Sequence, residues 1–140
     1  MRAIVQRVSE AAVTVGEARI AAIGPGLLVL LGVDRADAPE AADRMARKLL
    51  ALRVFEDDRG RMNRSVIDAG GELLCVSQFT LLGNVASGNR PSFSQAAAPE
   101  LAEPIYERVR EALGAQGGSF GDHMRVSLVN DGPVTILVEV

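Results

Sequence analysis

Apolar and polar positions divide this chain into short strand-like runs and two helical stretches. Residues 1–15, MRAIVQRVSEAAVTV, change character from one residue to the next, which is typical of a half-buried strand. The segment ARIAAIG, residues 18–24, predicts a returning strand, with Gly16-Glu17 as the turn. The run GLLVLLGV, residues 26–33, is apolar throughout, and this pattern predicts a strand that is covered on both faces.

Two later segments space their apolar residues like helices. Pro39 is expected to open the first, because a proline in the first turn forfeits no intrahelical hydrogen bond. Its apolar stripe is Ala42, Met45, Ala46, Leu49 and Leu50. The second helix is expected to start at Ala98-Pro99, with Pro104 as another candidate for its first turn. Its stripe is Leu101, Ile105, Val109 and Ala112/Leu113.

The middle of the chain combines one more buried pattern with two polar loops. GGELLCVSQFTLL, residues 70–82, predicts a buried strand, and GNVASGNRPSFS, residues 83–94, predicts a loop marked by glycines. EDDRGRMNRS, residues 56–65, is a polar turn region. Its three acids, Glu56 to Asp58, have no His or Cys near them, which favours a plain loop over a metal site.

The end of the chain predicts two strands, at about residues 124–130 and 134–140. Between them, Asn130-Asp131-Gly132-Pro133 predicts a hairpin turn, because glycine accepts positive φ at no steric cost. Together these patterns indicate about seven strands and two helices. We therefore expect an α/β fold in a single domain, residues 1–140, with helices on one face of the sheet.

Composition places the chain among ordinary globular proteins. It has 140 residues, of which 48% are hydrophobic and 24% charged. Arg2 and Arg7 interrupt what would have to be the apolar part of a signal peptide, and no apolar run is long enough to span a bilayer. The single cysteine, Cys75, rules out an internal disulfide and fits a reducing cytoplasm, where it is expected to be a small buried hydrophobe.

Charge is unevenly distributed along the chain. The net charge of −3 argues against a general nucleic-acid coat. Residues 44–64, however, contain seven basic residues and three acids, a local balance of 7 − 3 = +4. This segment is either a solvated face or a source of phosphate contacts. Its basic residues are Arg44, Arg47, Lys48, Arg53, Arg59, Arg61 and Arg64.

The standard catalytic motifs are absent from the sequence. There is one histidine, His123, so a site built from several histidines is excluded, and no nucleophile elbow, P-loop or zinc-protease motif occurs. The spacing of Ser77, His123 and the acids gives no support to a catalytic triad. If the protein is an enzyme, we expect backbone groups, positioning or the substrate itself to provide the catalysis.

Three polar clusters each have a structural and a functional interpretation. Ser77-Gln78-Phe79-Thr80 is either a sheet alternation with Phe79 in the core, or a strand end whose N–H groups hold an oxyanion. Arg90-Pro91-Ser92-Phe93 is either a turn or a platform for a nucleotide base. The third cluster, residues 130–133, is either a turn or a backbone shaped for a ligand.

Five motifs, in order and across essentially the whole chain, resemble the D-aminoacyl-tRNA deacylases of the bacterial and eukaryotic type. The SQFTL motif favours this main family over the related animal group, which carries a different motif there. The five motifs are QRV at residues 6–8, GLLVLLGV at 26–33, SQFTL at 77–81, RPSF at 90–93 and SLVNDGPVT at 127–135.

The resemblance implies a three-layer β/β/α architecture with mixed or antiparallel sheets, and a cytoplasmic homodimer with active sites at the subunit interface. It implies hydrolysis of the ester that joins a D-amino acid, or glycine mischarged on tRNA-Ala, to the terminal adenosine of a tRNA. This reaction is a chiral proofreading step in translation. No cofactor, metal or membrane is implied. The resemblance also implies that the 2′-hydroxyl of the RNA assists the reaction, so DNA is not expected as a partner.

The resemblance also assigns roles to residues. Gly132-Pro133 corresponds to a Gly-cisPro motif that enters the other subunit's pocket and rejects L side chains, and Arg7 holds this motif. The ester is expected to lie against Ser77, Gln78, Phe79 and Thr80, chiefly their backbone groups, with the Thr80 hydroxyl ranked below its N–H. The adenosine is expected to lie against Pro91, Ser92, Phe93 and Met124.

Two departures from the family pattern keep alternatives open. The lysine that often precedes RPSF is missing, and FGDHM stands where FGADM is common, so His123 is interpreted as a surface or rim substitution. The missing lysine leaves open a catalytically weak, dimeric tRNA-binding module. A conventional hydrolase that uses Ser77 or Cys75 with His123 is a further alternative.

Overall fold

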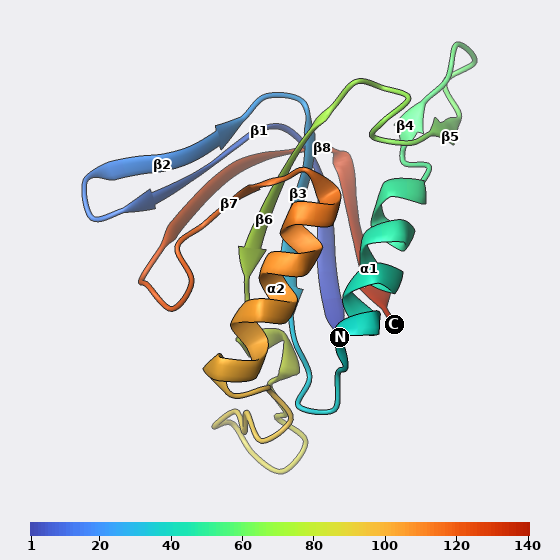
Figure 1. Cartoon of the computed structure of the whole chain (residues 1–140). Coiled ribbons are helices and arrows are strands. Elements are labelled where there is room, and N and C mark those ends of the chain that lie inside the picture. Colours follow the sequence, from blue (N-terminus) through green and yellow to red (C-terminus); the bar gives the residue numbers. More distant parts are fainter.

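The computed structural model describes residues 1–140 and has at its centre one strongly bent, mixed sheet (Figure 1). The sheet order is β2 (Ala18–Ile23), β1 (Arg2–Val15), β3 (Gly26–Gly32), β6 (Glu72–Ser77) and β7 (Gln116–Gly117), and β8 (Arg125–Glu139) also pairs with β1. The pairs β3–β6 and β6–β7 are parallel, and the pairs made by β1 are antiparallel. The predicted strands of the first 33 residues, with their turn at Gly16, are confirmed.

Two separate apolar cores define three layers. Along β3, Leu27, Val29 and Leu31 point into a core of 24 buried residues that the helices cover. Leu28, between them, belongs to a second core of eight buried residues on the other face, where the bent sheet closes on itself. The prediction that this strand is covered on both faces is confirmed, as are the single-domain α/β fold and its β/β/α layers.

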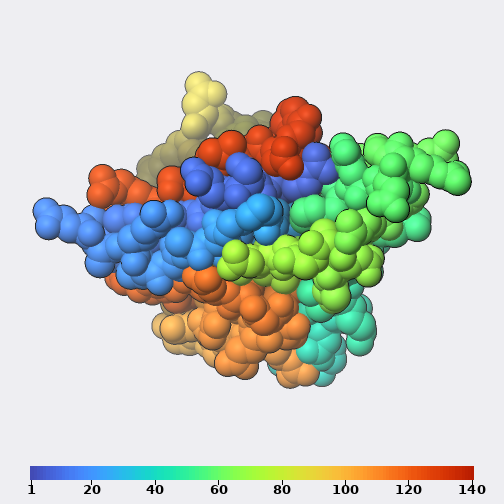
Figure 2. Space-filling view, turned by 90° about the horizontal axis from the view of Figure 1, so that it is seen from above, coloured from blue at the N-terminus to red at the C-terminus, as the bar shows by residue number.

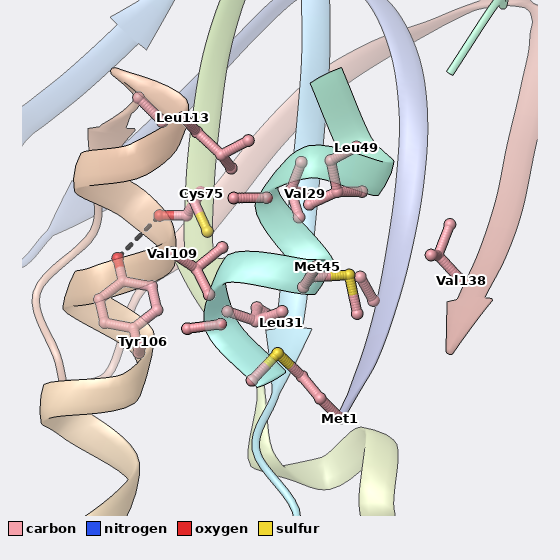
Figure 3. Packing of buried hydrophobic residues seen from close by; sticks show 14 of the residues in the cluster. Met1, Val29, Leu31, Met45, Leu49, Cys75, Tyr106, Val109, Leu113 and Val138 are labelled. Carbon is pink, nitrogen blue, oxygen red and sulfur yellow. Dashed lines mark hydrogen bonds between the residues drawn. The ribbon is translucent and has the colours of Figure 1, made fainter. Parts of the chain in front are cut away.

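Helices α1 (Pro39–Ala51) and α2 (Pro99–Leu113) lie side by side on one face of the sheet (Figure 3). Each begins at the predicted proline, so Pro104 lies inside α2. The predicted stripe of α2 needs a correction, because Leu101 and Ala112 are exposed. Its buried residues are Ala102, Ile105, Tyr106, Val109 and Leu113. In the large core, the Tyr106 hydroxyl donates a 2.8 Å hydrogen bond to the carbonyl of Cys75 (Figure 3).

The predicted hairpin at residues 130–133 is wrong. One continuous strand, β8, passes through these residues and pairs with β1 on both sides of them. Gln6 faces Thr135 and Val8 faces Asn130, so residues 131–134 bulge out of the ladder while β1 advances by only two residues. The local turn signal was overridden because β1, with 14 residues, is long enough to pair with both halves of β8.

Two further segments differ from their predictions. Strand β6 ends at Ser77, and residues Phe79–Leu82 form a 3₁₀ helix, η1. Phe79 is therefore not a core residue of an alternating strand, and 53% of it is exposed. The polar turn region contains a small hairpin, β4 (Phe55–Glu56) and β5 (Met62–Arg64). None of the helices is long and apolar enough to cross a membrane.

Candidate functional site

A cavity of about 540 Å³ opens where β6 ends. Five segments line it: the residue after β3, the end of β6 with the start of η1, the loop after Arg90, the start of α2, and the segment that leads into β8. Of the predicted site residues, Ser77, Gln78, Phe79, Phe93 and Met124 all line this cavity. The structure therefore gathers three of the sequence motifs around one space.

The backbone at the end of β6 leaves donors unpaired. The Gln78 N–H still donates to the Leu31 carbonyl at 2.8 Å, which continues the pairing with β3 for one residue. The next two N–H groups, those of Phe79 and Thr80, begin the 3₁₀ helix and have no acceptor within the chain. Such adjacent free donors are the kind of group that can stabilise a developing oxyanion.

Two phenylalanines form one wall of the cavity. The rings of Phe79 and Phe93 meet edge to face, with centroids 5.1 Å apart and an interplanar angle of 69°. Both are partly exposed, and a Cβ on Gly83 would lie only 3.0 Å from the Phe93 ring, so this glycine leaves room for the ring. An exposed aromatic pair beside a cavity offers a flat apolar surface for a planar ligand.

Met124 is fixed in the opposite wall. Its sulfur accepts a hydrogen bond from the Ser119 N–H at 3.3 Å. A Cβ on Gly118 would come within 2.5 Å of the same sulfur, so the glycine there makes space for it. The thioether is therefore positioned by its own loop.

Asp122 and His123 also line the cavity, and the sequence did not place them there. Their position directly before Met124, the one residue of this segment assigned to the pocket, was the available signal. The Asp122 carboxylate accepts a hydrogen bond from the Ser119 hydroxyl, which ties it to the loop. His123 and Ser77 share the cavity without a hydrogen bond between them.

Neither the Cys75 thiol nor the Thr80 hydroxyl is activated as a nucleophile. Burial raises the pKa of the Cys75 thiol to about 12, and Cys75 lies in the core on the helix side of the sheet. The Thr80 hydroxyl is exposed and accepts a hydrogen bond from the Gln78 amide, with no acid or base beside it. Of the residues considered as nucleophiles, Ser77 alone lines the cavity.

The other predicted residues lie outside the cavity. Pro91 and Ser92 belong to the loop that carries Phe93, and Ser92 and Asn84 exchange backbone hydrogen bonds of 2.9 and 2.8 Å that fix this loop. Thr80 does not line the cavity, and neither do Arg7, Gly132 and Pro133. The last three form a separate structure in the bulge of β8.

Arg7 is the centre of that second structure and is only 8% exposed. Its Nη1 donates to the Val54 carbonyl at 2.6 Å, and its Nε donates to the Asp131 carbonyl at 3.2 Å. The Asn130 amide donates to the carbonyls of Arg7 and Val134, each at 3.0 Å. These bonds hold the bulge at both of its ends, at Asp131 and at Val134.

Gly132, inside this clamp, has φ +114°, and a Cβ there would collide with the Arg7 guanidinium. The expected cis bond before Pro133 is corrected: the structure contains no cis peptide bond, so Gly132–Pro133 is trans. The trans form is the intrinsically favoured one, by about 0.5–1 kcal/mol for X–Pro. The unusual backbone at this point comes from the positive φ of Gly132 instead.

Relatives with a similar sequence align with nearly the whole chain. A protein named D-aminoacyl-tRNA deacylase from Symbiobacterium thermophilum is 58% identical over 144 residues, covering 99% of this chain and 95% of the relative. A protein of the same name from Chlorobaculum parvum is 54% identical, with 99% and 97% covered.

Two solved structures share the fold. One, described as a c-Myc DNA unwinding element binding protein, has a TM-score of 0.92 and 47% identity and covers 100% of this chain and 99% of its own. The other, a probable eukaryotic D-amino acid tRNA deacylase, has a TM-score of 0.81 at 20% identity, with 99% and 98% covered. The family model described as D-Tyr-tRNA(Tyr) deacylase matches residues 4–139, and this chain belongs to that family.

Proposed function

We propose that this chain hydrolyses the ester bond of D-aminoacyl-tRNA and releases the free D-amino acid and the tRNA. One observation carries the proposal: the cavity at the end of β6 is lined by the Phe79–Phe93 pair and by Phe79, whose N–H group, like that of the adjacent Thr80, has no acceptor. A backbone oxyanion site beside a base platform suits an amino-acid ester on a terminal adenosine. The deacylase name of the relatives supports the same reaction.

The proposed chemistry needs no side-chain nucleophile. Water attacks the ester carbonyl, the carbonyl oxygen gains charge against the two N–H groups, and the 3′-oxygen of the adenosine leaves as a hydroxyl. One oxyanion donor contributes about 3–4 kcal/mol of transition-state stabilisation in enzymes where it was removed. Because aminoacyl esters are already labile, we assign the remaining assistance to the 2′-hydroxyl of the RNA.

We place the terminal adenosine against Phe93 and Met124, on the loop that Pro91 and Ser92 shape. The adenine ring would stack on the exposed face of Phe93. Stacking of this kind is available to every base, because every base has a flat π-face. The ester would then reach Ser77, Gln78 and the start of η1. Both groups of residues line the same cavity, which supports this placement of the substrate.

Chiral selection requires a second element, which we assign to the bulge of a second subunit. In the proposed homodimer, Gly132-Pro133 of one subunit enters the other subunit's cavity, held by Arg7. A rigid backbone there leaves no space for an L side chain, whereas a D side chain points away and glycine has none. The clamp of hydrogen bonds around Arg7 supports this role, which depends on a stiff protrusion and not on a cis bond.

The decisive experiment compares D-tyrosyl-tRNA with L-tyrosyl-tRNA. We expect rapid release of D-tyrosine and little release of L-tyrosine; equal rates, or no hydrolysis of either, would refute the proposal. Glycyl-tRNA-Ala should be hydrolysed as well. Because one similar structure is described as a DNA-element binding protein, a DNA duplex belongs in the assay, and we expect it not to compete with tRNA. We place the reaction in the cytoplasm, where charged tRNA is found.

A catalytically weak tRNA-binding module is the second candidate, favoured by the missing lysine before Arg90. Tight tRNA binding without D-specific turnover would select it. A hydrolase that uses His123 as its base gains some support from the position of this residue in the cavity. The variant His123→Ala distinguishes this reading: we expect it to keep most of the activity, and a complete loss would favour the histidine mechanism.

A further inference from the structure

The hairpin β4–β5 projects from the body of the protein beside the end of α1 (Figures 1 and 2). Its shape is fixed by Asp57, whose carboxylate accepts hydrogen bonds from the N–H groups of Arg59 and Arg61 and from the Asn63 amide, at 2.8–3.0 Å. These bonds hold the pKa of Asp57 below its usual value, the Asn63 bond most of all. A charged carboxylate is thus used to build the turn.

Free cations remain on this hairpin. Arg53, just before it, and Arg59 and Arg61, in its turn, are exposed and form no ion pair or side-chain hydrogen bond within the chain. Arg64 differs, because its guanidinium donates to the Asp68 carbonyl. The acids of the hairpin are Glu56, Asp57 and Asp58, and the carboxylate of Asp57 is engaged in the turn.

The hairpin and the bulge of β8 are joined by one residue. The Arg7 guanidinium donates both to Val54, directly before β4, and to Asp131, directly before Gly132. In Figure 2 the green of the hairpin lies at the right of the molecule, next to the red of β8 and the dark blue of β1. Arg7 therefore holds both the residue before Gly132 and the residue before the hairpin.

We propose that the β4–β5 hairpin of one subunit binds backbone phosphates of the tRNA whose aminoacylated end lies in the partner's cavity. This inference rests on the proposed function, in which Gly132 of one subunit reaches the other subunit's cavity. The hairpin then comes to the rim of that same cavity in trans. Two or three unpaired guanidinium groups on a stiff hairpin suit the phosphates of an acceptor arm, which continues away from the terminal adenosine.

Such contacts have a recognisable signature. A phosphate contact releases counterions, so each lost contact lowers the slope of log affinity against log salt by about one unit. It also acts on the whole tRNA and leaves the reacting ester unchanged. Removing the cations should therefore weaken tRNA binding and raise KM, while kcat and the preference for D over L stay as they were.

The first test compares Arg59→Ala/Arg61→Ala with Arg19→Glu, an exposed site on β2 with the same change of two charges. We expect the double variant to weaken D-tyrosyl-tRNA binding roughly tenfold at physiological salt, with a salt slope smaller by about two. Hydrolysis of D-tyrosyl-adenosine, which lacks the acceptor arm, should be unchanged in both variants. Equal tRNA affinity in all three proteins, or a change of oligomeric state in the double variant, would overturn the inference.

The second test asks which cavity the hairpin serves. In mixed dimers, one subunit carries Gly132→Val, so its bulge no longer serves the cavity of its partner. The Arg59→Ala/Arg61→Ala substitutions are then placed either on this subunit or on its partner. We expect tRNA KM to rise only when the hairpin variant is on the subunit whose bulge is intact. A rise only for the opposite arrangement would refute action in trans. Full activity of the Gly132→Val homodimer would instead refute the proposed role of the bulge, whatever the hairpin does.

Discussion

The cavity at the end of β6 and the bulge clamped by Arg7 use backbone groups in opposite ways. At the cavity, the N–H group of Phe79 is left without an acceptor, as is that of Thr80 next to it, and the rings of Phe79 and Phe93 are partly exposed. At the bulge, the neighbouring carbonyls are satisfied by a buried guanidinium and by the Asn130 amide. N–H groups without acceptors can bind a ligand, whereas a bulge held by hydrogen bonds at its ends contributes mainly its shape.

This difference explains how a hydrolase can lack a catalytic set of side chains. The cavity provides polarity, and the bulge provides a rigid surface, but one chain keeps them in different regions. A homodimer would bring a polar cavity and a rigid surface together twice. Four single substitutions each remove one property of one region, and we expect the largest effect at Gly132 and the smallest at Thr80.

Gly132→Val changes the shape of the bulge. The new Cβ would collide with Arg7, and φ +114° is strained for any residue with a side chain. We expect turnover of D-tyrosyl-tRNA to fall at least about a hundredfold, the scale associated with a misplacement of 1 Å in an active site. Gly16→Val, at φ +58° with nothing within 4 Å of its Cβ, is the matched control and should keep the activity. Comparable losses in both variants would point to general strain.

Arg7→Leu removes the hydrogen bonds that hold the bulge, and its effect is measured as a loss of folding stability. The carbonyls of Val54 and Asp131 would lose a buried charged donor. We expect the free energy of unfolding to fall by about 2–3 kcal/mol, measured by urea denaturation. Asp131→Asn is the comparison, because its carboxylate is 58% exposed and 3.4 Å from Arg7, and it should cost less than about 1 kcal/mol. Equal, small losses would mean that the clamp does not hold the bulge.

Phe93→Ala attacks the wall of the cavity. We expect KM for D-tyrosyl-tRNA to rise about tenfold, because stacking of a base on an aromatic ring contributes about 1–3 kcal/mol. The lost contact with Phe79 should cost no more than about 0.5–1.5 kcal/mol of stability. Phe93→Tyr keeps the ring and should keep KM. A lower kcat with unchanged KM would argue that the ring acts on the chemical step.

Thr80→Ala should have the smallest effect. The substitution removes a hydroxyl that only accepts a bond from Gln78 and leaves the N–H in place. We expect kcat for D-tyrosyl-tRNA to stay within about tenfold of the wild type, since removal of an oxyanion donor itself costs about 10²–10³-fold. Single-turnover kinetics measure it directly. A loss of several orders of magnitude would make the hydroxyl a nucleophile and would reverse the roles assigned to the cavity.

Much of this molecule follows from local patterns. The apolar run of β3 is buried on both faces, and both helices begin at the expected prolines. Strand burial and helix starts depend on the period of side chains and on φ restrictions, which a sequence carries within a few residues. The resemblance to the deacylase family, and not these local patterns, assigned Ser77, Gln78, Phe79, Phe93 and Met124 to a substrate site, and these residues line one cavity.

Other features depended on partners far along the chain. Asn130 to Pro133 have every local property of a hairpin turn, yet they form a bulge, because the 14-residue β1 pairs with both halves of β8. Phe79 fits an alternating strand, yet it is exposed, because β6 ends at Ser77 and η1 begins. The bond from Arg7 to Val54 joins residues 47 positions apart, and no local pattern predicts it.

The sequence by itself thus determined both helices, the strands of the first 33 residues and the family to which the chain belongs. The tertiary structure alone decided that His123 lines the cavity, that the NDGP segment becomes a bulge, and that Arg7 connects this bulge to the start of the β4–β5 hairpin. The physical reason is the range of the forces concerned. Side-chain periodicity acts within a turn or a strand, whereas strand pairing and the partner of a buried cation are settled only when distant segments meet.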